Sequence, residues 1–139
     1  MASELPEART SSAALPAPGA GLRIMVVDDN RDAAETLGML LEALGHEVVL
    51  AYGARQALAL AADAAQDVFL LDIGLPGMDG TELGRALRAQ ARHREAMLVA
   101  VTGYGQDRHN TRDAGFDHHL MKPAHIDDIN ALLLRRRRG

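Results

Sequence analysis

The sequence predicts an α/β protein: a doubly wound parallel sheet of five strands with five helices. Short apolar runs of five or six residues alternate with segments whose apolar residues recur every three or four positions. Such continuous apolar runs are typical of strands that are buried on both faces. This strand–helix alternation favours right-handed crossovers, which make the strands parallel and place helices on both sides of the sheet.

The first strand and helix are marked by their residue spacing. An apolar run over 22–27 ends at two aspartates and predicts a buried strand. Asn30, a favourable N-cap residue, begins a helix that runs to Leu44 and stops at Gly45. The predicted apolar face of this helix consists of Ala33, Leu37, Leu40, Leu41 and Leu44.

The same alternation continues to the end of the chain. Further strands are expected over 46–51, 67–71, 96–101 and 116–121, and further helices over 53–65, 79–91, 104–114 and from about 126 onward. The 104–114 segment is polar and has the weakest helical pattern. Apolar residues at helical spacing are Leu83 with Leu87, and Ile126 with Ile129 and Leu133.

The composition of the 139 residues is that of a single domain without covalent cross-links. There is no cysteine, which excludes disulfides, a thiolate nucleophile and cysteine-based metal sites. No apolar run approaches the ~18 residues of a membrane helix, and the N-terminal segment lacks the hydrophobic stretch of a secretory signal. We therefore expect a cytoplasmic protein with no membrane insertion.

Differences in composition divide the chain into three parts. Residues 1–21 are rich in Ser, Ala, Pro and Gly and predict a disordered segment or linker. Residues 22–134 form the expected domain, and 135–139 a basic tail whose arginines suit the C-terminal end of a helix dipole. Because the net charge is −4 despite this tail, the domain itself is acidic, which argues against direct binding of nucleic acid.

Four of the five predicted strands are followed by a polar residue that can act on phosphate or a metal ion. These residues are Asp28 and Asp29, Asp72, Thr102 and Lys122. The carboxyl ends of parallel strands meet at one edge of the sheet, where ligands of such folds bind. Taken singly, each of these residue types is common in turns and caps, so the prediction of a site depends on their convergence.

The chemistry of the three predicted carboxylates calls for a cation. At ~4 Å two like charges repel by about 1 kcal/mol in water and by more near a protein surface. A few carboxylates with open water positions suit Mg²⁺, which recruits phosphate oxygens. Lys122 is the one lysine among fifteen basic residues, and its mobile ammonium suits a phosphate oxygen. The six histidines show no metal-ligand spacing, and His118 and His119 are adjacent, so they face opposite sides of a strand.

Four motifs, in this order along the chain, resemble the receiver domain of two-component response regulators. They are Val26–Asp29, Leu71–Gly80, Val101–Gly103 and Met121–Pro123. The resemblance covers about residues 22–134. It implies a flavodoxin-like sheet of order 2-1-3-4-5 and phosphorylation of Asp72 by a histidine kinase or a histidine phosphotransfer protein.

The resemblance also implies a role for each site residue. Asp29, Asp72 and the Gly74 carbonyl would bind Mg²⁺ directly, and Asp28 mostly through water. Lys122 and Thr102 would bind phosphoryl oxygens, and the Lys122–Pro123 bond would be cis. An aspartate carboxylate can attack a phosphoryl group to form a mixed anhydride. The domain would then regulate a partner protein or form a homodimer, and would dephosphorylate itself without being an enzyme for an external substrate.

Three residues are expected to tune this cycle. Thr102 and His119 would take part in the conformational switch, with His119 standing where the family usually carries Tyr or Phe. Tyr104, two residues after Thr102, would partly cover one side of the phosphoryl group, while Gly74 leaves space on the other.

Other interpretations stay open at this point. The chain could be a free-standing regulator or a receiver segment of a hybrid histidine kinase. A magnesium-dependent phosphatase would need an acid–base carboxylate two residues after its nucleophile, where this chain has Gly74. A pseudo-receiver that binds a partner without phosphorylation would not require the full set of polar residues that this chain retains.

Overall fold

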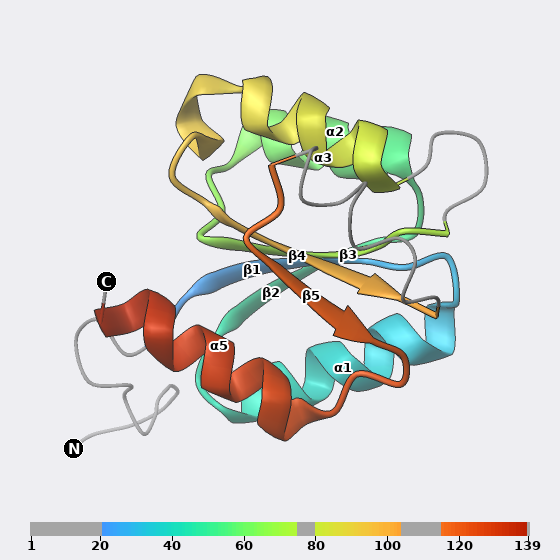
Figure 1. Cartoon of the computed structure of the whole chain (residues 1–139), viewed down its shortest axis with the longest axis vertical. Coiled ribbons are helices and arrows are strands. Elements are labelled where there is room, and N and C mark those ends of the chain that lie inside the picture. The colour runs from blue at the N-terminus through green and yellow to red at the C-terminus, as the bar shows by residue number, and fades with distance from the viewer. Residues whose placement is uncertain (1–20, 75–79, 104–114, 139) are drawn as a thin grey trace, which may run out of the picture.

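The fold is a five-stranded parallel sheet of order β2-β1-β3-β4-β5 with helices on both faces (Figure 1). The structure is a computed structural model that describes residues 21–74, 80–103 and 115–138. The strands are β1 (Arg23–Val27), β2 (Glu47–Ala51), β3 (Val68–Asp72), β4 (Met97–Thr102) and β5 (His118–Met121). The helices are α1 (Arg31–Ala43), α2 (Ala54–Asp63), α3 (Gly80–Ala89) and α5 (Ile126–Arg138), with a short 3₁₀ helix, η1, over Ala91–His93.

The predicted fold class and strand order are confirmed, and most element bounds agree with the prediction within two residues. The predicted helix over 104–114 and almost all of the predicted N-terminal linker lie outside the described residues. Helix α5 continues through Arg138, so the basic run forms its last turn. Within the described part of the chain, no helix is long and apolar enough to cross a membrane.

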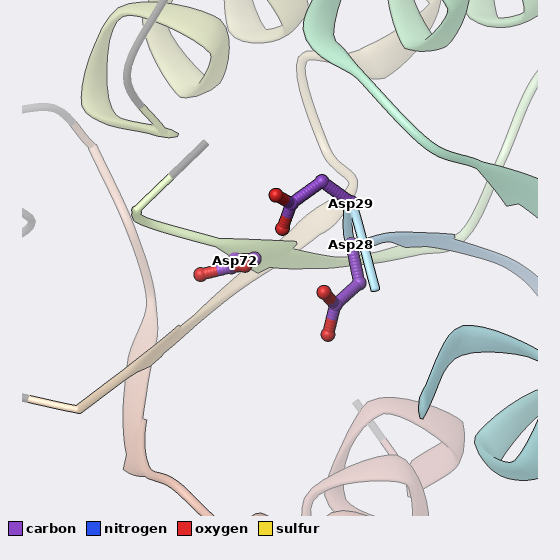
Figure 2. A group of neighbouring side chains, drawn as sticks. All are labelled: Asp28, Asp29 and Asp72. Carbon is purple, nitrogen blue, oxygen red and sulfur yellow. The ribbon is translucent and has the colours of Figure 1, made fainter. Parts of the chain in front are cut away.

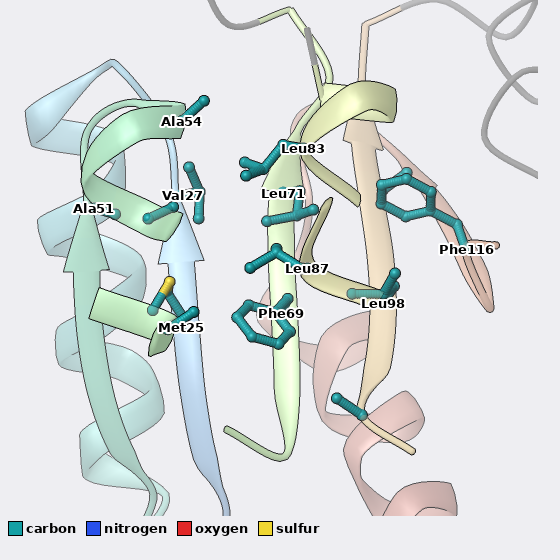
Figure 3. Packing of buried hydrophobic residues seen from close by; sticks show 14 of the residues in the cluster. Met25, Val27, Ala51, Ala54, Phe69, Leu71, Leu83, Leu87, Leu98 and Phe116 are labelled. Atoms are coloured by element: carbon teal, nitrogen blue, oxygen red, sulfur yellow. The ribbon is translucent and has the colours of Figure 1, made fainter. Parts of the chain in front are cut away.

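Two separate layers of apolar side chains hold the helices on the sheet. Helices α2 and α3 cover one face, and α1 and α5 cover the other (Figure 1). On the α2/α3 face, Met25, Phe69 and Leu71 pack against Leu83 and Leu87 (Figure 3). The α1/α5 face is formed by the alternate strand residues, such as Ile24, Val26, Leu70 and Val99, packed on Leu41, Ile129 and Leu133. Every residue of β3 is buried because this strand lies at the centre of the sheet.

The predicted apolar face of α1 was wrong in part. The helix buries Ala34, Gly38 and Leu41. Three residues of the predicted face are exposed instead: Ala33, Leu40 (44%) and Leu44 (45%). The buried stripe is therefore rotated toward the small residues. The physical reason is a close approach to β2, since a Cβ on Gly38 would lie 3.1 Å from Leu50 Cδ2.

The predicted ends of α1 are confirmed. The Asn30 side chain accepts a hydrogen bond from the Ala33 N–H at 3.0 Å, and so caps the helix. Gly45 follows the helix at φ +98°, a conformation that favours glycine. These caps fix where the helix begins after β1 and where the chain turns into β2.

Candidate functional site

Three carboxylates converge at the carboxyl edge of the sheet (Figure 2). Asp28 and Asp29 follow β1, and Asp72 is the last residue of β3. The two strands are neighbours, with Val27 paired to Leu71, so the residues that follow them share one location. One carboxylate oxygen from each aspartate lies within 4.8 Å of the others, a spacing that could hold a metal ion.

Lys122, which follows the edge strand β5, reaches this cluster across β4. Its Nζ lies 3.2 Å from Asp72 Oδ2. Its backbone N–H donates to the Thr102 carbonyl at 2.8 Å, which extends the pairing of β5 with β4 up to the site. The Lys122–Pro123 peptide bond is cis, as predicted.

Asp72 is oriented at both of its oxygens. Its side chain is almost entirely buried, unlike that of Lys122. Oδ1 accepts a hydrogen bond from the Gly74 N–H at 3.0 Å, and Oδ2 faces the Lys122 ammonium. These two contacts fix the orientation of the carboxyl group, and an aspartate carboxylate can act as a nucleophile.

Asp28 has a pKa above the ordinary value for an aspartate. Burial raises its pKa, and the nearby charges of Asp72 and Asp29 act in the same direction. The Asn30 N–H, which donates to Asp28 Oδ1 at 2.9 Å, opposes this shift, as does Lys122. The cluster therefore carries more negative charge than its one lysine offsets, a condition that a divalent cation would relieve.

Two glycines shape the chain beside Asp72. A Cβ on Gly74 would lie 3.7 Å from Asp72 Oδ1, so any side chain at this position would stand against the carboxylate. A Cβ on Gly80 would lie 2.6 Å from Ile73 Cα, too close for any other residue without a shift of the backbone. The Gly80 N–H also donates to the Ile73 carbonyl at 3.0 Å. Helix α3 thus begins in direct contact with the residue that follows Asp72.

The predicted switch residues lie on one part of the sheet. Thr102 is buried at the end of β4. His119 pairs with Ala100, and because alternate residues share a face, it lies on the same face as Thr102. Its side chain is half-buried, and both ring nitrogens are shielded from solvent. Tyr104 lies outside the described residues.

A groove beside the site was not foreseen from the sequence. It has a volume of about 670 Å³ and runs from Asp72 and Lys122 between α1 and the start of α5. Leu37, Leu40 and Ile126 line it. Leu40 is partly exposed and lines this groove, whereas the apolar pattern of α1 had assigned it to the core. No sequence pattern therefore indicated the groove.

Comparisons with known proteins agree with this geometry. Residues 24–134 match the family model of the response regulator receiver domain. Response regulator MprA of Mycolicibacterium vanbaalenii is 36% identical over 118 residues, which are 83% of this chain and 51% of that protein. Sensor histidine kinase AtsR of Burkholderia thailandensis is 31% identical over 119 residues, which are 84% of this chain and 20% of that protein. The chain thus spans about half, or less, of the length of these curated relatives.

A solved structure shares both the fold and part of the sequence. Response regulator TrrA of Thermotoga maritima, in complex with Mg²⁺ and BeF, superposes with a TM-score of 0.75 at 26% identity. The match covers 83% of this chain and 98% of that one. The chain therefore belongs to the family of response regulator receiver domains of two-component signalling.

Proposed function

We propose that Asp72 accepts a phosphoryl group from the phosphohistidine of a histidine kinase or a histidine phosphotransfer protein. The observation that carries this proposal is the meeting of three carboxylates and Lys122 at one sheet edge, with Asp72 held at both oxygens. An Asp72 oxygen forms the new bond to phosphorus while the phosphorus–nitrogen bond breaks and the imidazole leaves with the electron pair.

Mg²⁺ is the metal that this donor set fits. Asp29, Asp72 and the Gly74 carbonyl would hold it directly, with Asp28 acting mostly through water. Oxygen ligands in small number, with positions left for water, suit Mg²⁺. The TrrA structure, which contains Mg²⁺ with BeF, supports the same assignment. The bound ion would supply neutralisation of phosphoryl oxygens.

Two further residues of this chain would bind the other phosphoryl oxygens. Lys122 binds a second phosphoryl oxygen. The 3.2 Å between its Nζ and Asp72 Oδ2 supports this role, because the new phosphoryl group would be bonded to the Asp72 carboxylate. The buried Thr102 hydroxyl binds a third oxygen. Phosphoryl transfer mainly needs such positioning and neutralisation.

Signalling would follow from the new charge at Asp72. A phosphoryl group adds about −1.5 to −2 charges, and Thr102 moves toward it while His119 repacks on the same face of the sheet. The altered surface regulates a partner protein or allows a homodimer to form. Water then hydrolyses the aspartyl phosphate, with access through Gly74 and partial cover from Tyr104, and the domain acts on no other substrate in the cytoplasm.

Incubation with acetyl phosphate and Mg²⁺, followed by intact-mass measurement, tests the proposal. We expect one phosphoryl adduct that is lost in Asp72→Asn and that requires Mg²⁺. The asparagine keeps the shape and one acceptor oxygen, so the variant is a matched control. No adduct, or an adduct that persists in Asp72→Asn, would instead favour a pseudo-receiver that binds its partner without phosphorylation.

A further inference from the structure

One arginine holds the opposite edge of the sheet, far from the carboxylates. Arg88, near the end of α3, donates through Nη1 to the carbonyls of Ala96 at 2.6 Å and Arg94 at 2.9 Å. Through Nη2 it donates to the Gly115 carbonyl at 2.9 Å and to Asp117 Oδ2 at 3.1 Å. A single planar guanidinium thus joins the chain entering β4 to the chain entering β5.

Asp117 carries this constraint into the sheet. Its Oδ2 also accepts a hydrogen bond from the Leu98 N–H at 2.9 Å. Its own N–H donates to the Leu98 carbonyl at 2.8 Å. The pair sets the start of β5 against β4, and the register that follows places His118 beside Val99 and Met121 beside Thr102.

Strand β5 depends on such a constraint more than the other strands do. It is an edge strand of four residues, it pairs with β4 alone, and none of its residues is fully buried. Register is weakly specified where few side chains enter a core. A slip of one residue would displace the strand by ~3.3 Å and turn its side chains to the other face.

The far end of β5 leads directly into Lys122, whose Nζ lies 3.2 Å from Asp72 Oδ2. An error in register would remove this contact. We infer that Arg88 is a positioning residue for phosphoryl transfer: from the amino edge of the sheet it holds β5 so that Lys122 meets Asp72. This inference rests on the proposed role of Lys122 in binding the phosphoryl group.

The variant Arg88→Lys tests the inference most cleanly. Lysine keeps the charge but lacks the fork that binds both strand entries. Because small misplacements in an active site cost large factors in rate, we expect phosphorylation by acetyl phosphate to slow about tenfold. The Mg²⁺ affinity, measured by calorimetry, should not fall, because the carboxylates follow β1 and end β3, and loss of the Lys122 contact removes only a positive charge from their surroundings. General structural damage would lower both.

A second measurement follows the geometry without any phosphoryl donor. Amide hydrogen exchange at residues 118–122 should accelerate in Arg88→Lys, and not in Arg85→Lys, which changes an exposed arginine of the same helix. Arg88→Ala should slow phosphorylation and accelerate amide exchange more than Arg88→Lys does.

Two results would overturn the inference: an unchanged phosphorylation rate with unchanged exchange, or an equal loss of rate and Mg²⁺ affinity. A parent chain that takes up no phosphoryl group would contradict the proposed function instead. The exchange experiment would then still decide whether Arg88 holds β5.

Discussion

Charged side chains are paired at the amino edge of the sheet, whereas charges of the same sign are gathered at its carboxyl edge. At the amino edge, Arg88 and Asp117 meet several partners each, so that both side chains act as internal cross-links. At the carboxyl edge, three carboxylates lie together, Lys122 contacts Asp72, and Asp28 has a raised pKa because of burial and its acidic neighbours. Satisfied polar groups contribute stability, whereas an excess of one charge costs stability and creates a demand for a ligand.

The largest effect on stability is expected at the amino edge. Asp117→Ala removes the acceptor of the Leu98 N–H and one partner of Arg88, which should lower the free energy of unfolding by about 1–3 kcal/mol. Urea denaturation followed by circular dichroism measures this loss. Glu42→Ala, at an exposed acid of α1, is the control, and an equal result for both variants would contradict the cross-link.

A smaller effect of opposite sign is expected at the carboxyl edge. Asp28→Asn keeps an oxygen for the Asn30 N–H but removes a repelled charge, so the metal-free domain should gain about 1 kcal/mol. The same variant should bind Mg²⁺ more weakly. Denaturation in EDTA at low ionic strength and calorimetry with Mg²⁺ test the two statements, and added salt should reduce the stability gain. A destabilised variant would show that the carboxylates do not oppose one another.

The smallest effect at neutral pH concerns one imperfect contact near the amino edge. His93 of η1 is fully buried against Phe69, and its Nδ1 lies 3.0 Å from Gln90 Oε1. Its Nε2 makes no hydrogen bond within the described part of the chain. Burial lowers the pKa of His93. The Ala64 carbonyl acts in the opposite direction, and the positive charge of Arg92 lowers this pKa further.

The unfolded chain binds a proton at His93 more readily than the folded chain does. Protonation of this ring therefore opposes folding below pH 6.5, the ordinary pKa of histidine, and has no such effect well above it. Stability should fall as the pH drops below that value toward the lowered pKa of the folded state. The unfolding free energy of the parent minus that of His93→Leu should therefore become lower, with its sign kept, as the pH is reduced from 8 to 5. A constant difference would mean that this ring does not titrate on unfolding.

Most of the described elements, and the sheet edge at which the polar residues gather, were predictable from the sequence. Asn30 and Gly45 mark the ends of α1 by local chemistry, and polar residues after the strands of a parallel sheet necessarily meet at one edge. Both inferences need only short-range spacing and the handedness of the connections.

The buried stripe of α1 and the pairing of polar groups depended on tertiary packing. Both neighbouring stripes of α1 carry apolar residues, so the choice depended on how closely Gly38 approaches β2. Arg88 contacts Gly115 and Asp117, which lie 27 and 29 residues further along the chain. Residue spacing within one helix or strand cannot predict such contacts. Long-range packing and the burial of charge therefore set what the sequence pattern leaves open.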